Sequence, residues 1–423
     1  MRGAHKTMNG NNIEGKSGKP ITRRSAVFGG VCFFSLVYSM PALALNSDIA
    51  FRRWIADFKK TALNAGITPA TFNLAFKGVD SPDPEVLKKA AYQPEFTDPT
   101  WNYFDNRVQD NAIALGRAHG KKWAKWLSAI EKRFGVDRNI LLAIWSIESD
   151  FGEAMDRDTA MRDAIRSLAT LGFGDKRRAK YAQTQLIAAL KILQSGDIDR
   201  AHLQGSWAGA LGHTQFIPTS YLIYAVDMDG DGKRDIWTSV PDALATAANL
   251  LKKNGWQEGR GWGYEVILPE NGKFPPGSLT LSEWAKMGVK RADGKPFANP
   301  SDKATLKLPD GRKGPVFLVT KNFFVIKRYN SADRYALAVG LLSDRIAGRP
   351  GLVKDWNRPF SPLNIQERQE LQTRLTKMGY YHGNIDGKNG EITKKAIQAF
   401  QSRNGLPTDG NPSRELLTIL RSR

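Results

Sequence analysis

Apolar residues recur at the spacing of amphipathic helices through most of residues 48–260. The pattern is clear in the segments FRRWIADFKKTAL, KKWAKWLSAIEKRF, NILLAIWSIE and DALATAANLLKKNGW. The same spacing returns at about 333–347. Helices with one apolar stripe must cover it against one another, so the pattern predicts a mainly helical region over residues 45–347.

The pattern changes between these helical stretches. Short runs that read YEVILP, ATLKLP, PVFLVT and FFVIKRY are separated by turns that contain Pro and Gly. Runs of this length, rich in β-branched and aromatic residues and bounded by turns, are typical of strands. We therefore predict a small strand-containing insert at about 262–328, within an α+β fold that is mainly α.

A segment rich in Pro and Gly, RPGLVKDWNRPFSP, predicts a linker at 348–360. Residues 361–423 then carry the apolar stripes of three helices, with Asn411 as a cap for the third and Pro412 at its first position. We predict a separate three-helix domain at 361–423. Its stripes are Leu371, Leu375 and Met378, then Ala396, Ile397 and Phe400, then Leu416, Leu417 and Leu420.

Residues 1–44 have the order of a secretory signal peptide. Basic residues dominate 1–24, an uncharged apolar stretch follows, and the small-x-small sequence Ala42-Leu43-Ala44 closes it. The pair in TRRSAVF also resembles a twin-arginine signal. The alternative is a membrane anchor, but the apolar stretch is short for a span. Because Val31 before Cys32 argues against a lipoprotein, we expect a soluble protein exported to the periplasm, with no stable membrane anchor.

Charge and cysteine content narrow the classes of partner and chemistry. The chain has 62 Lys and Arg against 42 Asp and Glu, a formal net charge of +20, which predicts an anionic partner. Export argues against nucleic acid and favours the cell wall, whose peptides and muramyl lactyl groups carry carboxylates. The one cysteine lies in the predicted signal peptide. A disulfide framework, a cysteine-rich zinc site and a cysteine nucleophile are therefore excluded for the mature chain.

Glu148 is the candidate acid. In GVDRNILLAIWSIESDFG it falls on the apolar stripe of a predicted helix, one turn after Ile144 and Trp145 and three residues before Phe151, with no acid at i±3 or i±4. A carboxyl against an apolar wall should have a raised pKa and keep its proton near neutral pH, as a general acid requires. Spacing alone favours the plainer interpretation, a helix-end glutamate that reaches solvent or bonds a buried donor.

A glycine-rich motif, GSWAGALGHTQFIPTSY, offers a second candidate element. Its small residues would let a ligand approach the backbone closely, and Gln215 could donate to and accept from a sugar amide or hydroxyl. Tight helix–helix packing explains the same composition equally well.

The segment DMDGDGKRDIWT resembles the opening of an EF-hand calcium loop, with aspartates two residues apart and Gly232 at the sixth position. The twelfth position holds Thr238 where an EF-hand has a bidentate glutamate, so Asp242 would have to substitute from the next helix. A capped acidic turn is the alternative. The predicted ligands of a structural calcium ion are Asp227, Asp229, Asp231, Lys233 through its carbonyl, and Asp242.

These motifs occur in an order that resembles the lytic murein transglycosylase B family. The similar stretches are QPEFTDPTW, GVDRNILLAIWSIESDFG, SLATLGFGDKRRAKY, GSWAGALGHTQFIPTSYLIYAVD and FFVIKRYNSADRYALAV, over roughly 48–345. The tail LQTRLTKMGYYHGNIDGKNGEITKKAIQAFQ resembles a peptidoglycan-binding repeat domain. The resemblance implies a lysozyme-like helical catalytic region, with a three-helix peptidoglycan-binding domain after it.

The resemblance also implies a chemistry. Glu148 occupies the family's catalytic position and would cleave the β-1,4 bond between N-acetylmuramic acid and N-acetylglucosamine without water, leaving 1,6-anhydromuramyl ends. A single carboxyl making both proton transfers does not need the usual glycosidase pair. Some family members hold calcium or sodium in a similar loop, and no cofactor is otherwise required. The positions that match the glycan-binding residues of the family are Ser206, Gln215, Tyr329, Asn330 and Tyr335.

Two alternatives to this function stay open at this point. A muramidase-type hydrolase on the same fold would use Asp150 or Asp158 to activate water, and a non-catalytic scaffold would only bind the wall. The expected partners are peptidoglycan glycan strands and, through them, wall-synthesis proteins. We expect a monomer that binds no nucleic acid.

Overall fold

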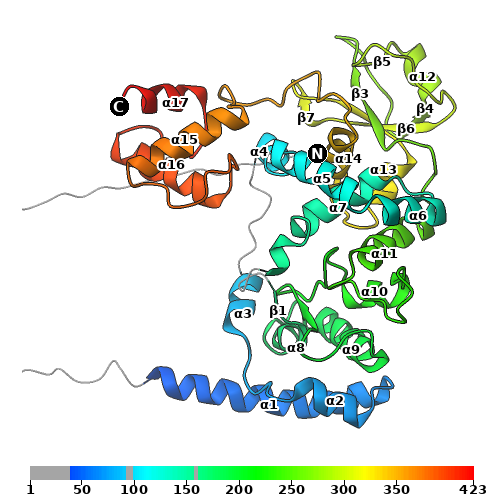
Figure 1. Ribbon diagram of the computed structural model, residues 1–423, viewed down its shortest axis with the longest axis vertical. Coiled ribbons are helices and arrows are strands. Elements are labelled where there is room, and N and C mark those ends of the chain that lie inside the picture. The colour runs from blue at the N-terminus through cyan, green and yellow to red at the C-terminus, as the bar shows by residue number, and fades with distance from the viewer. Residues whose placement is uncertain (1–38, 92–98, 157–160) are drawn as a thin grey trace, which may run out of the picture. The chain divides into compact units, whose positions relative to one another are not determined.

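The computed structural model describes residues 39–91, 99–156 and 161–423 (Figure 1). Residues Ser47–Arg423 form one compact unit. The predicted signal peptide falls mostly on residues 1–38, outside the described residues, and the first described helix runs through its predicted cleavage site. Within the described part of the chain, no helix has the length and apolar character needed to cross a bilayer.

The helical region predicted for 45–347 is present. Short loops join its elements, and several ends carry recognisable signals: Asp137 accepts a hydrogen bond from the backbone of Asn139 at one start, and Gly135 and Gly196 end two helices in the left-handed conformation. The helices are α1 (Ser39–Asn64), α2 (Pro69–Phe76), α3 (Pro84–Ala91), α4 (Thr100–Asp105), α5 (Asp110–Lys122), α6 (Ala124–Phe134), α7 (Arg138–Ser149), the 3-10 helix Glu153–Asp156, α8 (Ala164–Gly174), α9 (Ala179–Ser195), α10 (Pro218–Tyr224), α11 (Val240–Lys253), α13 (Lys321–Ile326) and α14 (Asp333–Ile346).

Helix α7 lies at the centre of this region. It packs against α5, α6, α11 and α14, and its residues from Ile140 to Ser146 are buried without interruption. A helix that is apolar around most of its circumference must be enclosed, and this enclosure fixes the position of its last turn. The last turn of α7, which carries Glu148, is therefore held in a fixed position by the buried part of the helix before it.

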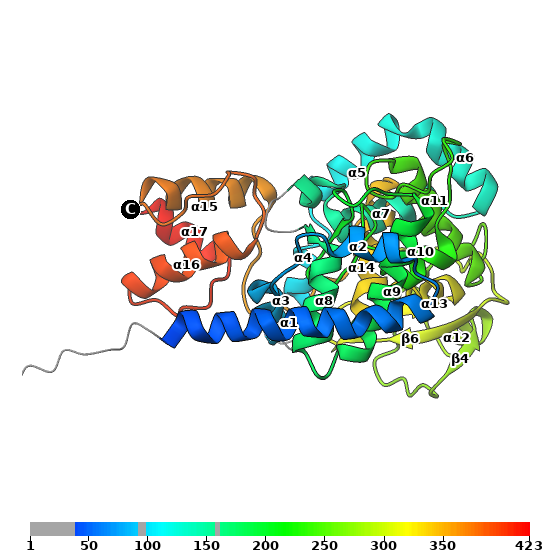
Figure 2. The same cartoon turned by 90° about the horizontal axis from the view of Figure 1, so that it is seen from below.

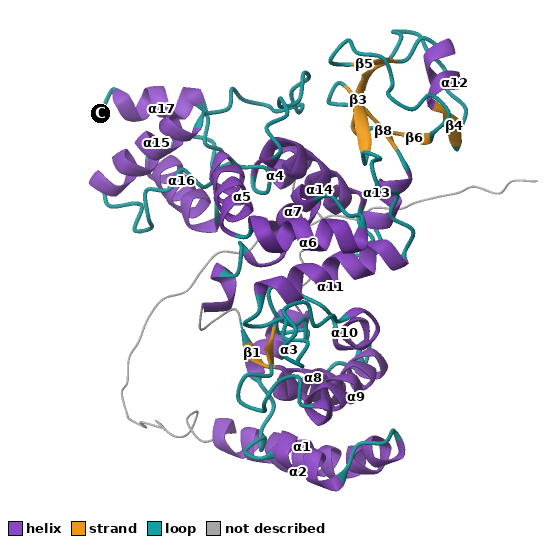
Figure 3. Ribbon diagram, turned by 45° about the vertical axis from the view of Figure 1, so that its right-hand side comes forward, coloured by secondary structure: helices purple, strands orange, loops and turns teal. Residues whose placement is uncertain are grey.

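The strand-containing insert forms a five-stranded antiparallel sheet in the order β4-β6-β8-β3-β5, with Tyr264 opposite Leu318 in its centre. Its own small core contains Leu281 and Trp284 from helix α12, which begins with a capping box between Thr280 and Glu283. Figure 3 shows these strands gathered beside α12. The elements are β3 (Gly263–Ile267), β4 (Ser278–Thr280), α12 (Leu281–Lys286), β5 (Lys290–Arg291), β6 (Lys303–Lys307), β7 (Pro309–Arg312) and β8 (Phe317–Val319); β1 (Arg162–Asp163) and β2 (Gln204–Gly205) pair separately.

One predicted strand is wrong. The run FFVIKRY belongs to helix α13 and the turn that follows it. Its aromatic and β-branched content resembles a strand, but Asn322, Phe323 and Ile326 are buried at helical spacing, and α13 packs against α14. Packing against a neighbouring helix decides the conformation over the local preference of the side chains.

The C-terminal domain has the three predicted helices, α15 (Ile365–Lys377), α16 (Glu391–Arg403) and α17 (Arg414–Arg421), packed together as a bundle (Figure 2). All the predicted stripe residues enter its core, where Met378 is only partly buried. The predicted cap is wrong: Ser413, not Asn411, accepts the bond from Leu416 N at the start of α17. Ser413 forms an isolated antiparallel β-bridge with Pro362, and α17 begins after it, two residues later than predicted.

We predict that Gly340→Ala destabilises the protein, although alanine normally favours a helix. A Cβ at Gly340 in α14 would lie 2.4 Å from the ring of Trp262, a rigid side chain that is itself buried. Overpacking of this kind costs about 1–3 kcal/mol and exceeds the gain of about 1 kcal/mol in helix propensity. Thermal unfolding measures the difference.

Gly120→Ala in α5 is the matched control, since its Cβ would meet only a flexible methyl of Leu142 at 3.3 Å. Its melting temperature should stay the same or rise. Equal melting temperatures for the two variants would contradict the predicted clash.

Candidate active site

Glu148 lies in the last turn of α7, and Tyr335 from α14 bonds to it. The Tyr335 hydroxyl donates to Glu148 Oε1 at 2.6 Å. Tyr335 is 3% exposed, whereas Glu148 keeps part of its surface accessible. The carboxyl is therefore surrounded by protein but open enough for a substrate to reach it.

The environment of Glu148 favours its protonated form. Desolvation raises the pKa of Glu148 to about 7, and the Tyr335 bond and the positive charge of Arg107 offset only part of this effect. The charged group that acts on Glu148, among the described residues, is thus a cation and not a second carboxylate. The raised pKa agrees with the sequence-based prediction. Of the plainer interpretation, the form in which the glutamate reaches solvent does not fit, whereas the bond to a buried donor is present, from Tyr335.

A stack of tyrosines forms one wall beside this carboxyl. The rings of Tyr329 and Tyr335 lie 6.3 Å apart and nearly parallel. The Tyr329 hydroxyl donates to the backbone carbonyl of Thr214, and its ring meets the edge of Phe216. Burial raises the pKa of both tyrosines well above the usual value, so both remain neutral donors at physiological pH. Tyr329 thereby links Glu148 to the glycine-rich loop.

The glycine-rich loop is also bonded directly to α7. The indole of Trp145 donates to His213 Nδ1 at 3.2 Å, and the hydroxyl of Ser149 donates to the His213 carbonyl at 2.6 Å. Gln215 has a positive φ of 49° and its amide donates to the carbonyl of Gly212 at 2.9 Å. Gly212 is required here, because a Cβ would lie 2.3 Å from the carbonyl oxygen of Ile236. Gln215 is therefore held in the loop that Tyr329 joins to the site.

The other two predicted glycan-binding residues bond within their own loops. The Ser206 hydroxyl accepts from the backbone of Ala210 at 3.1 Å, in the turn after β2. Asn330 is exposed and its side-chain oxygen accepts from the backbone of Ala332 at 3.1 Å. The structure brings Glu148, Tyr335, Tyr329 and the Gln215 loop together through direct contacts. It shows no such contact for Ser206 or Asn330 among the described residues.

Two functional candidates were missed by the sequence analysis. Arg107 lies over the ring of Tyr103 at 3.8 Å and lowers the pKa of Glu148, while the charge of Glu148 helps to raise the pKa of Tyr103. Both follow the family-like stretch that ends at Trp101. The sequence did offer one signal for them: Tyr103 and Arg107 are four residues apart, the spacing of neighbours on one face of a helix.

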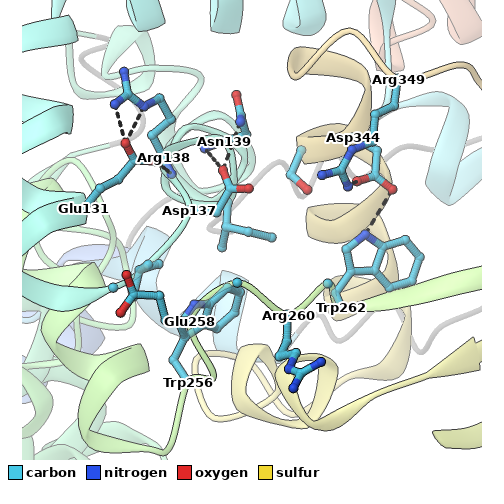
Figure 4. A pocket seen from close by; sticks show the side chains of 16 residues that line it. Glu131, Asp137, Arg138, Asn139, Trp256, Glu258, Arg260, Trp262, Asp344 and Arg349 are labelled. Carbon is cyan, nitrogen blue, oxygen red and sulfur yellow. Dashed lines mark hydrogen bonds and ion pairs between the residues drawn. The ribbon is translucent and has the colours of Figure 1, made fainter. Parts of the chain in front are cut away.

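Other buried carboxyls have raised pKa values but different surroundings. A cavity of about 510 Å³ lies at the opposite end of α7 and contains Asp344 (Figure 4). Burial raises the pKa of Asp344 to about 6, but Arg349 pairs with it at 2.6 Å and the Trp262 indole donates to it at 3.1 Å. A carboxyl engaged by an arginine and an indole is held as an anion. Glu148 is the better candidate for a proton donor.

The predicted calcium loop gathers some of its expected ligands. Carboxylate oxygens of Asp227, Asp229 and Asp242 lie within 4.8 Å of one another. Asp242 is fully buried in the first turn of α11, and its two oxygens accept from the backbone of Met228 and Asp235. Asp231 is exposed and accepts from the backbone of Lys233 at 2.8 Å. Three hard oxygen donors around a tight turn suit Ca²⁺.

The alternative function, a hydrolase, would use Asp150 or Asp158 to activate water. Asp158 lies outside the described residues. Asp150 follows the last residue of α7 and its carboxylate lies 3.2 Å from the ammonium of Lys388 in the C-terminal domain.

Comparison with known proteins now decides the family. A model described as a transglycosylase SLT domain matches residues 50–344, and a peptidoglycan-binding domain model matches 364–420. The chain belongs to the transglycosylase SLT domain family. Its matched regions agree with the helical region and the three-helix domain of the fold, so the lysozyme-like class predicted from sequence is confirmed.

Membrane-bound lytic murein transglycosylase B of Escherichia coli is 33% identical over 53% of this chain, and the match spans 62% of that relative. SltB3 of Pseudomonas aeruginosa, solved with NAG-anhNAM-pentapeptide, is 44% identical with a TM-score of 0.69, covering 88% of this chain and 99% of SltB3. Slt35 of Escherichia coli, solved with calcium, is 26% identical with a TM-score of 0.58, covering 70% of this chain and 92% of Slt35.

We predict that Tyr335→Phe moves the pH dependence of this transglycosylase homologue toward higher pH. Glu148 has a pKa of about 7 and is protonated at lower pH. As a general acid it must be protonated, so kcat/KM should fall as the pH rises through about 7. Removing the Tyr335 hydroxyl removes a bond that lowers this pKa. The midpoint of the alkaline limb should rise by about one pH unit.

Tyr329→Phe is the control, because the Tyr329 hydroxyl bonds to Thr214 and not to Glu148. Its midpoint should match that of the parent protein. An alkaline limb that stays in place in Tyr335→Phe would mean that another group controls the pH dependence.

Proposed function

We propose that this chain is a lytic transglycosylase that cleaves the β-1,4 bond between N-acetylmuramic acid and N-acetylglucosamine in peptidoglycan and leaves 1,6-anhydromuramyl ends. The observation that carries the proposal is the carboxyl of Glu148, accessible yet desolvated, with a pKa raised to about 7 and a bond from Tyr335. The complex of SltB3 with an anhydro-sugar peptide supports the same chemistry.

In the first step, protonated Glu148 donates its proton to the oxygen that links the two sugars. The C–O bond on the muramic acid side breaks, and the positive charge that develops at C1 is stabilised by the substrate's own acetamido group. Tyr335 donates to Oε1 and stabilises the carboxylate that remains. Arg107 adds a positive charge whose effect on Glu148 grows as the glutamate becomes an anion.

In the second step, the Glu148 carboxylate takes the proton from the C6 hydroxyl of the same sugar. The C6 oxygen attacks C1 and closes the 1,6-anhydro ring, so the glutamate is protonated again and no water is consumed. One carboxyl with a pKa near neutral serves both as acid and as base. The cation near Glu148, in place of a second carboxylate, fits this mechanism better than hydrolysis by a carboxylate pair.

We predict that the protein releases soluble muropeptides with anhydro ends from purified sacculi, and that Glu148→Gln abolishes this release. Loss of the carboxylic proton of Glu148 should reduce turnover by about 100-fold or more. Mass spectrometry of the products identifies their ends. The matched control is Glu258→Gln. Glu258 is an exposed glutamate in the cavity at the other end of α7, so this variant should retain activity.

Each alternative function has a distinct outcome in this assay. Reducing ends in place of anhydro ends would indicate a muramidase-type hydrolase. Binding to sacculi without soluble products would indicate a scaffold. Retained activity in folded Glu148→Gln would remove Glu148 from the mechanism.

The site of action and the partners follow from the same proposal. The signal-like N-terminus and the net charge of +20 support export to the periplasm and contact with the anionic wall. The C-terminal domain would hold glycan strands while the helical region cuts them. We propose a monomer whose protein partners are wall-synthesis proteins that share this substrate.

We also propose a structural calcium ion in the loop between α10 and α11. Asp227, Asp229 and Asp242 would supply carboxylates, Lys233 its carbonyl, and Asp231 a further oxygen. The structure of Slt35 in complex with calcium supports calcium binding by a relative of this chain. The ion would fix the loop against α11 and takes no part in proton transfer.

We predict that calcium raises the melting temperature and that a chelator lowers it. At a hundredfold excess over the dissociation constant, binding to the folded state adds about 2.7 kcal/mol, which corresponds to several degrees. Asp229→Asn removes one ligand charge and should abolish the calcium-dependent shift, while Asp199→Asn, an exposed aspartate outside the loop, should preserve it. An unchanged melting temperature with calcium and with chelator would identify the segment as a capped turn only.

A further inference from the structure

The C-terminal domain contacts the turn that follows the candidate acid. The ammonium of Lys388, in the loop between α15 and α16, lies 3.2 Å from Asp150 Oδ2, and the two side chains are 31% and 28% exposed. Asp150 is two residues beyond Glu148. A side chain 238 residues away in the sequence therefore reaches the end of the helix that carries the reactive carboxyl.

This turn has an unusual backbone conformation. Asp150, Phe151 and Gly152 have φ values of 52°, 59° and 93°, so three consecutive residues occupy the left-handed region. A bulky residue such as phenylalanine rarely adopts this region, and does so only when its surroundings impose it. The conformation of the turn must therefore be maintained by the contacts around it.

Contacts from the helical region supply part of this support. The Ser149 hydroxyl accepts from Gly152 N at 3.0 Å, and the ring of Phe151 stacks on His119 at 4.8 Å. Lys388 adds a contact from the other domain. Its positive charge also offsets the unfavourable position of the Asp150 carboxylate at the negative end of α7.

The C-terminal domain is held near this turn by contacts that do not involve Lys388. In the linker, Trp356 stacks on Phe104 at 4.2 Å, and Phe360 meets the edge of Trp101 at 5.0 Å. Arg358, whose side chain is 10% exposed, donates to Asp105 at 3.1 Å. The segment 348–360, which leads into the C-terminal domain, thus packs against α4.

We propose that Lys388 is a positioning residue, through which the docked C-terminal domain holds the left-handed turn at the end of α7 and thereby the carboxyl of Glu148. This inference rests on the proposed function. If Lys388 has this role, the C-terminal domain that binds the wall also stabilises the end of the helix that carries Glu148. Binding to the wall and cutting are then linked by one ion pair.

The test compares Lys388→Met with the parent protein on soluble glycan strands prepared from sacculi with their stem peptides removed. If Lys388 acts on the geometry of Glu148, kcat should fall by about threefold to tenfold with KM unchanged, because a small misplacement of a catalytic group reduces the rate of the chemical step. The alkaline limb of the pH profile should stay in place, because the charge that acts on the pKa of Glu148 is that of Arg107. Lys388→Arg should restore most of kcat.

Two controls separate this role from a general loss of stability or charge. Lys395→Met removes the same charge from an exposed position in the same domain. Lys395 pairs with Glu391 one turn away, so this variant should leave kcat unchanged. If Lys388 acts through Asp150, the double variant with Asp150→Asn and Lys388→Met should be no slower than Asp150→Asn alone. All rates are measured well below the melting temperature of each variant.

A second measurement does not depend on turnover. Hydrogen exchange of the Gly152 amide, which donates to Ser149 Oγ, should become faster in Lys388→Met and stay unchanged in Lys395→Met. A higher KM with kcat unchanged would show that Lys388 contacts the glycan itself and would overturn the proposal, as would unchanged kcat and unchanged exchange. Products without anhydro ends from the parent protein would refute the proposed function instead, and the exchange data would still decide the role of Lys388.

Discussion

The burial of one carboxyl against a tyrosine hydroxyl is the interaction on which the candidate site depends. Desolvation keeps Glu148 protonated near neutral pH, and the Tyr335 bond limits how far its pKa rises. Too little burial would leave an ionised glutamate with no proton to donate. Too much, without the tyrosine, would leave an acid too weak to protonate the glycosidic oxygen in the first step.

The rest of the fold holds that carboxyl in position. Helix α7 is enclosed by four other helices, so its last turn cannot move without displacing a core. Trp145 and Ser149 bond to the glycine-rich loop through His213, and Tyr329 joins the same loop from the other side. The C-terminal domain adds Lys388 beyond the end of the helix. The glycine-rich loop, α14 and the C-terminal domain thus each contact the chain within three residues of Glu148.

Glu148 itself could be found from the sequence because its signal is local. Helical spacing places Ile144, Trp145 and Phe151 around it, and an apolar surrounding is enough to predict the direction of its pKa shift. Tyr335 and Tyr329 were reached only through the resemblance to a family, since no periodicity relates them to α7. Tyr103 in α4 and Arg107 in the turn after it were missed, because nothing in so short a segment indicates which distant carboxyl its side chains will face.

The sequence by itself determined the helical region, the three-helix tail, the position of the insert and the residue most suited to donate a proton. Each of these follows from apolar spacing and turn residues within a few neighbours along the chain. Tertiary structure decided that FFVIKRY forms a helix, that Ser413 caps α17, and that Tyr335, Arg107 and Lys388 surround the end of α7. These outcomes depend on contacts between segments far apart in sequence, where packing energies exceed the local preferences that a sequence pattern reports.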